Sequence, residues 1–216
     1  MYAQKIKEFL NPKERKVFAK LTSPKKIQDF LDATAINFEE KGETFYSPRR
    51  VLRERKAHCI EGALFAAAVL GYHGYPPLLL DFQTLPSDED HVITVFKEES
   101  LWGAISMTNH MILQWRDPIY KNIRELAMSY FHEYFLHDGK KSFRTFSKPF
   151  DLRRYPVEKW LIAEKNLNWL AEDLDASPHF PVLPKKMIPR LRKVTPFELQ
   201  ILKFTRWAPP KKKKAT

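Results

Sequence analysis

The chain has one cysteine, Cys59, and it stands directly before an apolar segment from Ile60 to Tyr72. Alanine and leucine give this segment a high helix propensity, and its apolar side chains occur all round, so we expect a buried helix that begins at the cysteine. A helix N-terminus favours a thiolate through its unpaired backbone N–H groups and its dipole. The same N–H groups can donate to an oxyanion, so Cys59 is a candidate nucleophile.

A nucleophilic cysteine needs a partner that accepts its proton, and His91 is the candidate. His91 opens the segment 91–96, whose β-branched residues predict a strand, and it follows the acidic loop 87–90. The carboxylates of this loop would favour the imidazolium form of His91 and therefore a thiolate–imidazolium pair.

The elements that position these two residues follow each other closely. The segment 78–85 is bounded by proline at both ends and predicts a strand. The strand that begins at His91 is followed by a polar break at 97–100 and a return strand at 101–106, which together predict a hairpin. We expect a three-stranded antiparallel sheet packed on the central helix.

Other helices are expected on both sides of this unit. Helices at 13–21 and 25–35 each follow a cap residue and a proline, and a short basic helix follows Ser47-Pro48. Apolar residues at helical spacing predict long helices over 118–136 and 157–174, and a last helix is expected near 196–207.

The order of these features resembles the transglutaminase-like superfamily of papain-like cysteine proteins. The features that match are Cys59 at a helix start, the turn Gly74-Tyr75-Pro76, His91 at a strand start and Trp102 in the next strand. The resemblance covers roughly residues 50–110. It implies a Cys–His site that works through a thioester, completed by a third residue that is usually an aspartate.

The third residue departs from the family pattern. Ser106 stands four residues after the tryptophan, where the acid is expected, and Asn109 follows shortly after. An asparagine can orient an imidazole through a hydrogen bond, whereas a serine does so weakly and adds no charge. We predict Asn109 as the third residue, with Ser106 as the alternative.

Three further residues are candidates for binding substrate. Glu61 lies in the first turn of the cysteine helix, where it could bind a substrate amine or cap the helix. Trp102 and Ser106 are the other two. A metal site built from His58 with His91 or His110 is a weaker hypothesis, because it lacks a second thiol and enough ligands. We expect no metal and no cofactor.

Composition limits the alternatives. With 44% hydrophobic residues the chain predicts a folded protein, and with a single cysteine it can form no internal disulfide. No apolar run reaches the length of a membrane span and the N-terminus has no signal-peptide core, so we expect a cytoplasmic protein.

The formal charge is +11, but residues 185–214 hold eleven lysines and arginines against Glu198 alone. An acidic partner is therefore expected at 185–214, and nucleic acid is not expected at the core.

We therefore predict an α+β protein with a papain/transglutaminase-like core and additional helices at both ends. The expected parts are a helical lead-in (1–40), the core (41–136), a helical and proline-rich extension (137–207) and a basic tail (208–216). The predicted function is thiol-dependent acyl transfer, or hydrolysis of an amide or peptide bond, with a peptide, amide or amine as substrate. The alternative is an inactive binding module, and a lone cysteine can also be a small buried hydrophobic residue.

Overall fold

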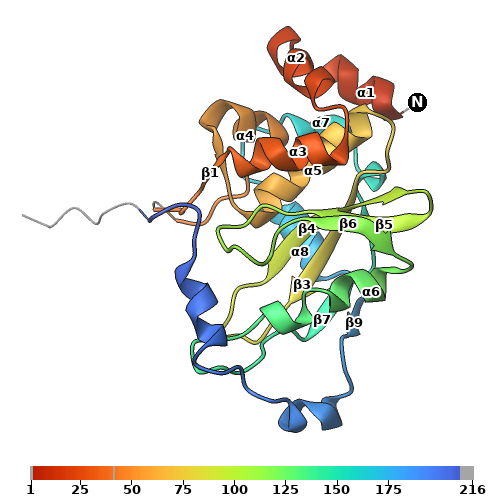
Figure 1. Cartoon of the computed structure of the whole chain (residues 1–216). Coiled ribbons are helices and arrows are strands. Elements are labelled where there is room, and N and C mark those ends of the chain that lie inside the picture. Colours follow the sequence, from red (N-terminus) through yellow and green to blue (C-terminus); the bar gives the residue numbers. More distant parts are fainter. Residues whose placement is uncertain (1, 41, 210–216) are drawn as a thin grey trace, which may run out of the picture.

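The protein mixes helices with an antiparallel sheet, as expected from the sequence (Figure 1). The computed structural model describes residues 2–40 and 42–209. Within them, the main sheet has seven strands in the order β6-β5-β4-β3-β7-β9, and β8 also pairs with β3. Its strands are β3 (Leu78–Gln83), β4 (His91–Glu98), β5 (Leu101–Ile105), β6 (Arg116–Tyr120), β7 (Thr145–Ser147), β8 (Phe150–Asp151) and β9 (His179–Pro181). Two short parallel strands, β1 (Ala35–Ile36) and β2 (Lys56–Ala57), form a separate pair.

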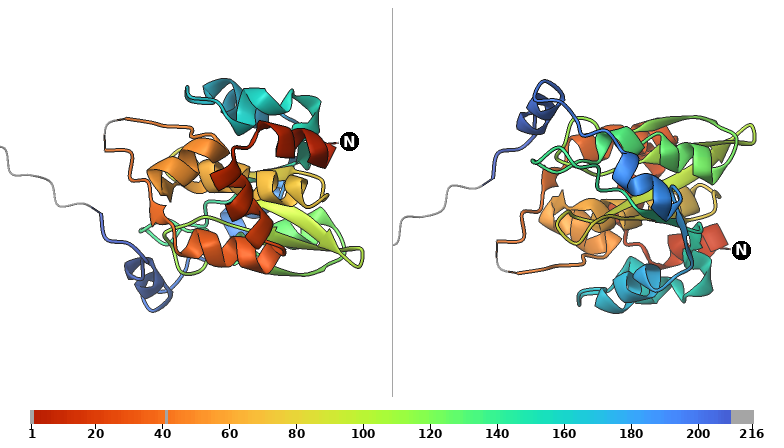
Figure 2. Two further views of the ribbon diagram at one scale, coloured as in Figure 1. Left: turned by 90° about the horizontal axis from the view of Figure 1, so that it is seen from above. Right: turned by 90° about the horizontal axis from the view of Figure 1, so that it is seen from below.

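Helices cover one face of the main sheet more heavily than the other. Helix α5 (Cys59–Tyr72) packs on β3 and β4, and the N-terminal helices lie over it (Figures 1 and 2). The remaining α-helices are α1 (Tyr2–Phe9), α2 (Pro12–Lys20), α3 (Pro24–Asp32), α4 (Pro48–Glu54), α6 (Ile123–Met128), α7 (Val157–Leu161) and α8 (Asn168–Asp175). Helix α6 lies on the opposite face, below the sheet in Figure 1.

The sheet separates two hydrophobic cores, and β4 contributes to both. Val92 and Phe96 point into the core that contains α5, while Ile93 and Val95 point into the core that contains α6. Every residue of β4 from His91 to Phe96 is buried. The central strand therefore carries apolar residues on both faces rather than on one.

Helix α5 is attached to the sheet at two points near its first turns. Thr94 on β4 donates from its hydroxyl to the carbonyl of Ala63 at 2.6 Å. A Cβ added to Gly62 would lie 2.3 Å from the Cβ of Met107, so only glycine allows this close approach. These contacts fix the start of the helix against the ends of β4 and β5.

Several predicted elements differ from the structure. The expected helix over 118–136 is wrong: β6 occupies Arg116–Tyr120, and α6 is only one and a half turns long. The helix over 157–174 is interrupted between α7 and α8, and 196–207 forms only a short 3₁₀ helix, Glu198–Lys203. In each case apolar spacing was read as one helix, although the same side chains are buried by separate short elements.

The sheet is also larger than the three strands expected. Strands β7, β8 and β9 lie beyond residue 137 and pair with β3 or with each other, so the sheet crosses the boundary expected at residue 136. Each of these strands is only two or three residues long and offers little periodicity. Three helices, rather than two, precede residue 40. Of the basic tail expected at 208–216, residues 210–216 lie outside the described residues.

Among the residues described, no helix combines the length and the apolar character needed to cross a membrane.

Candidate functional site

Cys59 lies where the sequence places it, at the first position of α5. The helix begins there because His58 is extended, with φ −104° and ψ −170°, and because the Glu61 carboxylate accepts from the backbone N–H of His58 at 3.0 Å. The first N–H groups of the helix therefore surround the thiol, which is half-buried at the wall of a cavity.

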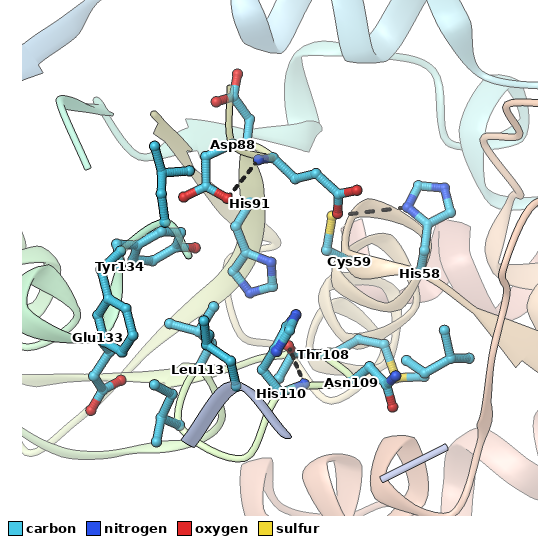
Figure 3. Close-up of a pocket in the computed structure, with 18 of the residues that line it drawn as sticks. His58, Cys59, Asp88, His91, Thr108, Asn109, His110, Leu113, Glu133 and Tyr134 are labelled. Carbon is cyan, nitrogen blue, oxygen red and sulfur yellow. Dashed lines mark hydrogen bonds between the residues drawn. The ribbon is translucent and has the colours of Figure 1, made fainter. Parts of the chain in front are cut away.

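The cavity measures about 820 Å³ and brings six chain segments together; several of its lining side chains are drawn in Figure 3. Its lining includes His58 and Cys59 from the start of α5 and His91 from the start of β4. The other contributions come from the loops 36–39, 86–90 and 107–113 and from residues 133–137. Ile201 and Leu202, close to the C-terminus, complete the wall. The Cys59 thiol and the imidazoles of His58 and His91 thus share one hollow that is large enough for a small molecule.

His91 is oriented by Ser106 and not by Asn109. The His91 Nε2 atom donates to the Ser106 hydroxyl oxygen at 2.8 Å, and that hydroxyl donates to the carbonyl of Leu113 at 2.6 Å. Because the serine proton is committed to Leu113, the serine oxygen accepts from His91, so neutral His91 carries its proton on Nε2. Its Nδ1 atom then has a free lone pair to accept a proton.

The predicted role of Asn109 is wrong. Its side-chain amide forms a pair of hydrogen bonds with the backbone of Trp207, at 2.8 and 3.0 Å. The asparagine therefore holds the end of the chain against the loop that follows β5. The segment 195–207, called the C-terminal strap below, is also held by Arg206, which forms an ion pair with Asp32 at 3.0 Å.

Ser106 is itself held rigidly. Its backbone N–H donates to the side chain of Gln28 at 2.9 Å, and its carbonyl accepts from the same side chain at 3.0 Å. Gln28 is buried in α3, and no local sequence signal separates it from other polar helix residues. Ser106 is only 1% exposed, so its predicted role in binding substrate is wrong.

Glu61 is also not a substrate ligand. Its side chain is fully buried and accepts from the hydroxyl of Thr44 at 2.8 Å, the N–H of Tyr46 at 2.9 Å and the amide of Asn37 at 3.1 Å. The capping alternative is confirmed, since Glu61 also accepts from the N–H of His58. Glu61 therefore ties the segment 37–46 to the start of α5.

Trp102 lies away from the cavity. It stands four residues before Ser106 on β5, which corresponds to about 13 Å along a strand. Its ring faces the ammonium group of Lys97, 4.5 Å away, and packs against the core below the sheet. The predicted binding role of Trp102 is therefore not supported by its position.

His58 is the residue whose importance the sequence did not reveal. Its Nδ1 atom lies 3.9 Å from the Cys59 sulfur, and its Nε2 atom donates to the carbonyl of Thr44 at 2.7 Å. Its sequence context suggests only a metal ligand, because the direction of a cap residue's ring is not encoded in local sequence. In the described ranges, no group of three or more His, Cys, Asp or Glu side chains is arranged to hold a metal ion.

The electrostatics of the site favour a thiolate. Burial alone would raise the pKa of Cys59, but the interactions with His58 and His91 outweigh burial and lower the pKa to about 6. Burial would also lower the pKa of His58, yet the contacts with Cys59, Glu61 and Thr44 raise it to about 10. At neutral pH the two neighbouring residues therefore form an ion pair.

The carboxylates of the acidic loop make their hydrogen bonds within the segment 84–89. Asp90 accepts from the backbone and hydroxyl of Thr84, at 2.7 and 3.1 Å, and Asp88 accepts from the N–H of Glu89 at 3.0 Å. Across the described part of the chain, no hydrogen bond or ion pair joins these carboxylates to the His91 ring. They line the mouth of the cavity instead.

Comparison with known proteins adds no family: no protein-family model matches the chain, and a search of curated proteins finds no match.

Proposed function

We propose that this protein is a transglutaminase-like cysteine enzyme with a papain-like core, which transfers or hydrolyses acyl groups through a thioester on Cys59. One observation carries the proposal: a thiol with a lowered pKa at a helix N-terminus shares a cavity with an imidazole whose tautomer is set by a third residue. The order of a cysteine helix, a strand, a histidine strand and a strand leading to the third residue also supports the resemblance.

The residues provide for both halves of the reaction. The Cys59 sulfur attacks the carbonyl carbon of the substrate, and the carbonyl oxygen becomes an oxyanion beside the first N–H groups of α5. The bond to the leaving group then breaks, the leaving group takes the proton that Nδ1 of His91 received from the attacking water or amine of the preceding turnover, and a thioester remains on the sulfur. Water or an amine attacks the thioester, gives its proton to Nδ1 of His91, and releases the sulfur as a thiolate.

Trapping of the acyl-enzyme tests this proposal. The protein is incubated with a panel of small activated esters, thioesters and aryl amides and then examined by intact mass spectrometry. We expect an acyl adduct on Cys59 that hydroxylamine removes, and no adduct on the Cys59→Ala variant. If the wild type and Cys59→Ala behave alike with every acyl donor, the proposal is overturned.

A second candidate function is an inactive binding module of the same fold, which docks on an acidic partner through residues 185–214. The observation that favours it is the neutral Ser106 in the position where the family has an acid, since a hydroxyl cannot stabilise an imidazolium by charge. Slow acylation of Cys59 without turnover, together with salt-sensitive binding to acidic polypeptides, would favour this function.

A further inference from the structure

The imidazoles of His58 and His91, which share the cavity with Cys59, have different polar surroundings. His58 is enclosed by acceptors: its Nε2 atom lies 2.7 Å from the Thr44 carbonyl oxygen and 3.5 Å from a carboxylate oxygen of both Glu39 and Glu61. Its other nitrogen faces the Cys59 sulfur. Every described polar contact of this ring is one that an imidazolium satisfies better than a neutral imidazole.

The negative charge behind His58 is fixed in place. Glu61 is fully buried, and its carboxylate is held by donors from three segments of the chain. A buried carboxylate needs a cationic or hydrogen-bonding environment to stay ionised. In the described structure the His58 ring lies against it, so Glu61 favours the imidazolium form of His58.

The hydrogen bond that the described structure gives the His91 ring is to a neutral group. Its ring nitrogen Nε2 contacts the hydroxyl of Ser106, which is neutral and is itself bonded to the carbonyl of Leu113. This chain of hydrogen bonds fixes the ring orientation and leaves Nδ1 as an acceptor. The contact suits a group that gains and loses a proton in each cycle.

We propose that His58, rather than His91, is the cationic partner that holds Cys59 as a thiolate, and that His91 is thereby free to transfer protons. In a two-residue pair one imidazole must supply the charge and also move the proton, whereas here the two tasks belong to separate residues. The raised pKa of His58, about 10, agrees with this division of roles. The inference rests on the proposed function of Cys59 as a nucleophile, but its test needs no acyl substrate.

Other titratable groups face the same thiol and enter the interpretation of any pH profile. Tyr134 lies on the far side of the cavity, and burial together with the charge on Cys59 raises its pKa well above the usual value, so it stays neutral (Figure 3). His110 faces His91, and burial lowers its pKa. The carboxylates of Asp88, Glu89 and Asp90 line the mouth of the cavity and oppose thiolate formation.

The test is the pH dependence of alkylation by iodoacetamide, in which the sulfur displaces iodide and forms a bond to the acetamide carbon. The variants are His58→Gln and His91→Gln, because a glutamine amide keeps a donor near the position of Nε2 and carries no charge. We expect the wild-type rate to reach half its maximum near pH 6. His58→Gln is expected to react about fivefold more slowly at that pH, which corresponds to a rise of about one unit in the pKa of Cys59. In His91→Gln the pH at half-maximal alkylation is expected to shift less.

The inference is overturned if the pH at half-maximal alkylation is unchanged in His58→Gln and raised in His91→Gln. Because His58→Gln alters a cap residue, a measurement on the wild type complements the variants. The ¹⁵N resonances of the His58 ring are expected to show the imidazolium form at about pH 8. Once Cys59 is alkylated, the transition of this ring to its neutral form is expected to move to lower pH. A neutral His58 ring at pH 8 before alkylation contradicts the proposal. The alkylation and NMR results hold whether or not an acyl-enzyme can be trapped. The role of His58 and the proposed thioester chemistry can therefore fail separately.

Discussion

The cavity has two walls that differ in how firmly they are built. The wall formed by α5 is part of the core: every residue from Ile60 to Gly71 is buried, and Glu61 ties its first turn to a neighbouring loop. The wall formed by the C-terminal strap contains no buried residue in its 3₁₀ helix, and Phe197 is 87% exposed. Groups that perform chemistry must be held to fractions of an ångström, whereas a covering segment can open and close. We therefore expect the reactivity of Cys59 to depend on the wall formed by α5, and the access of substrate to depend on the C-terminal strap.

The largest effect is expected from His91→Ala. Loss of the group that transfers protons should lower the turnover of an acyl substrate about 10³-fold. Iodoacetamide should still alkylate Cys59 near pH 6, because His58 remains beside the sulfur. Steady-state kinetics and alkylation rates on the same preparation measure the two effects. If turnover and the alkylation rate fall to the same degree, His91 also holds the thiolate.

The next effect concerns the stability of the α5 wall. Glu61→Ala removes a buried carboxylate that accepts from four groups, and it leaves the His58 charge without its fixed partner. We expect the free energy of unfolding in urea to fall by about 3 kcal/mol. Glu39→Ala is the matched control, since Glu39 also lies 3.5 Å from His58 but is partly exposed. If the free energy of unfolding falls equally in Glu61→Ala and Glu39→Ala, the interpretation that Glu61 holds the α5 wall in place is contradicted.

A smaller effect is expected from Ser106→Ala. The His91 ring loses the hydrogen bond that fixes its tautomer, and turnover should fall about tenfold, which is the equivalent of one hydrogen bond. Asn109→Ala is the control, because Asn109 follows in the same loop but contacts Trp207. Substrate kinetics at saturating concentration measure both. A larger fall for Asn109→Ala than for Ser106→Ala would restore Asn109 as the third residue.

The sequence predicted the parts of the site that depend on strong local signals. Cys59 at the start of a helix, the turn at Gly74 and the hairpin of β4 and β5 all follow from propensity, capping and β-branched runs. The same signals gave the α+β class. These elements are long, and their side chains are apolar on the faces that the fold buries.

The contacts that decide the roles of the polar residues were not predictable in this way. Asn109 and Ser106 are three residues apart, and which of them reaches His91 depends on where the loop after β5 turns and on the strap that binds Asn109. His58 acquires its partners from Glu39 and Thr44, which are distant in sequence. Hydrogen bonds between separate segments leave no periodic pattern, so only three-dimensional structure reveals them.

The smallest effect is expected in the strap itself. Asn109→Ala removes the two hydrogen bonds to Trp207, each worth about 1 kcal/mol, and should raise the population of the open strap about thirtyfold. Hydrogen exchange of the amides in 198–207 should accelerate accordingly, with little change in global stability. Gln200→Ala is the control, because that side chain bonds only within the strap. If exchange in Asn109→Ala stays at the wild-type rate while Gln200→Ala accelerates it, the strap is held by its own helix rather than by the loop after β5. The two walls would then differ in exposure but not in mobility.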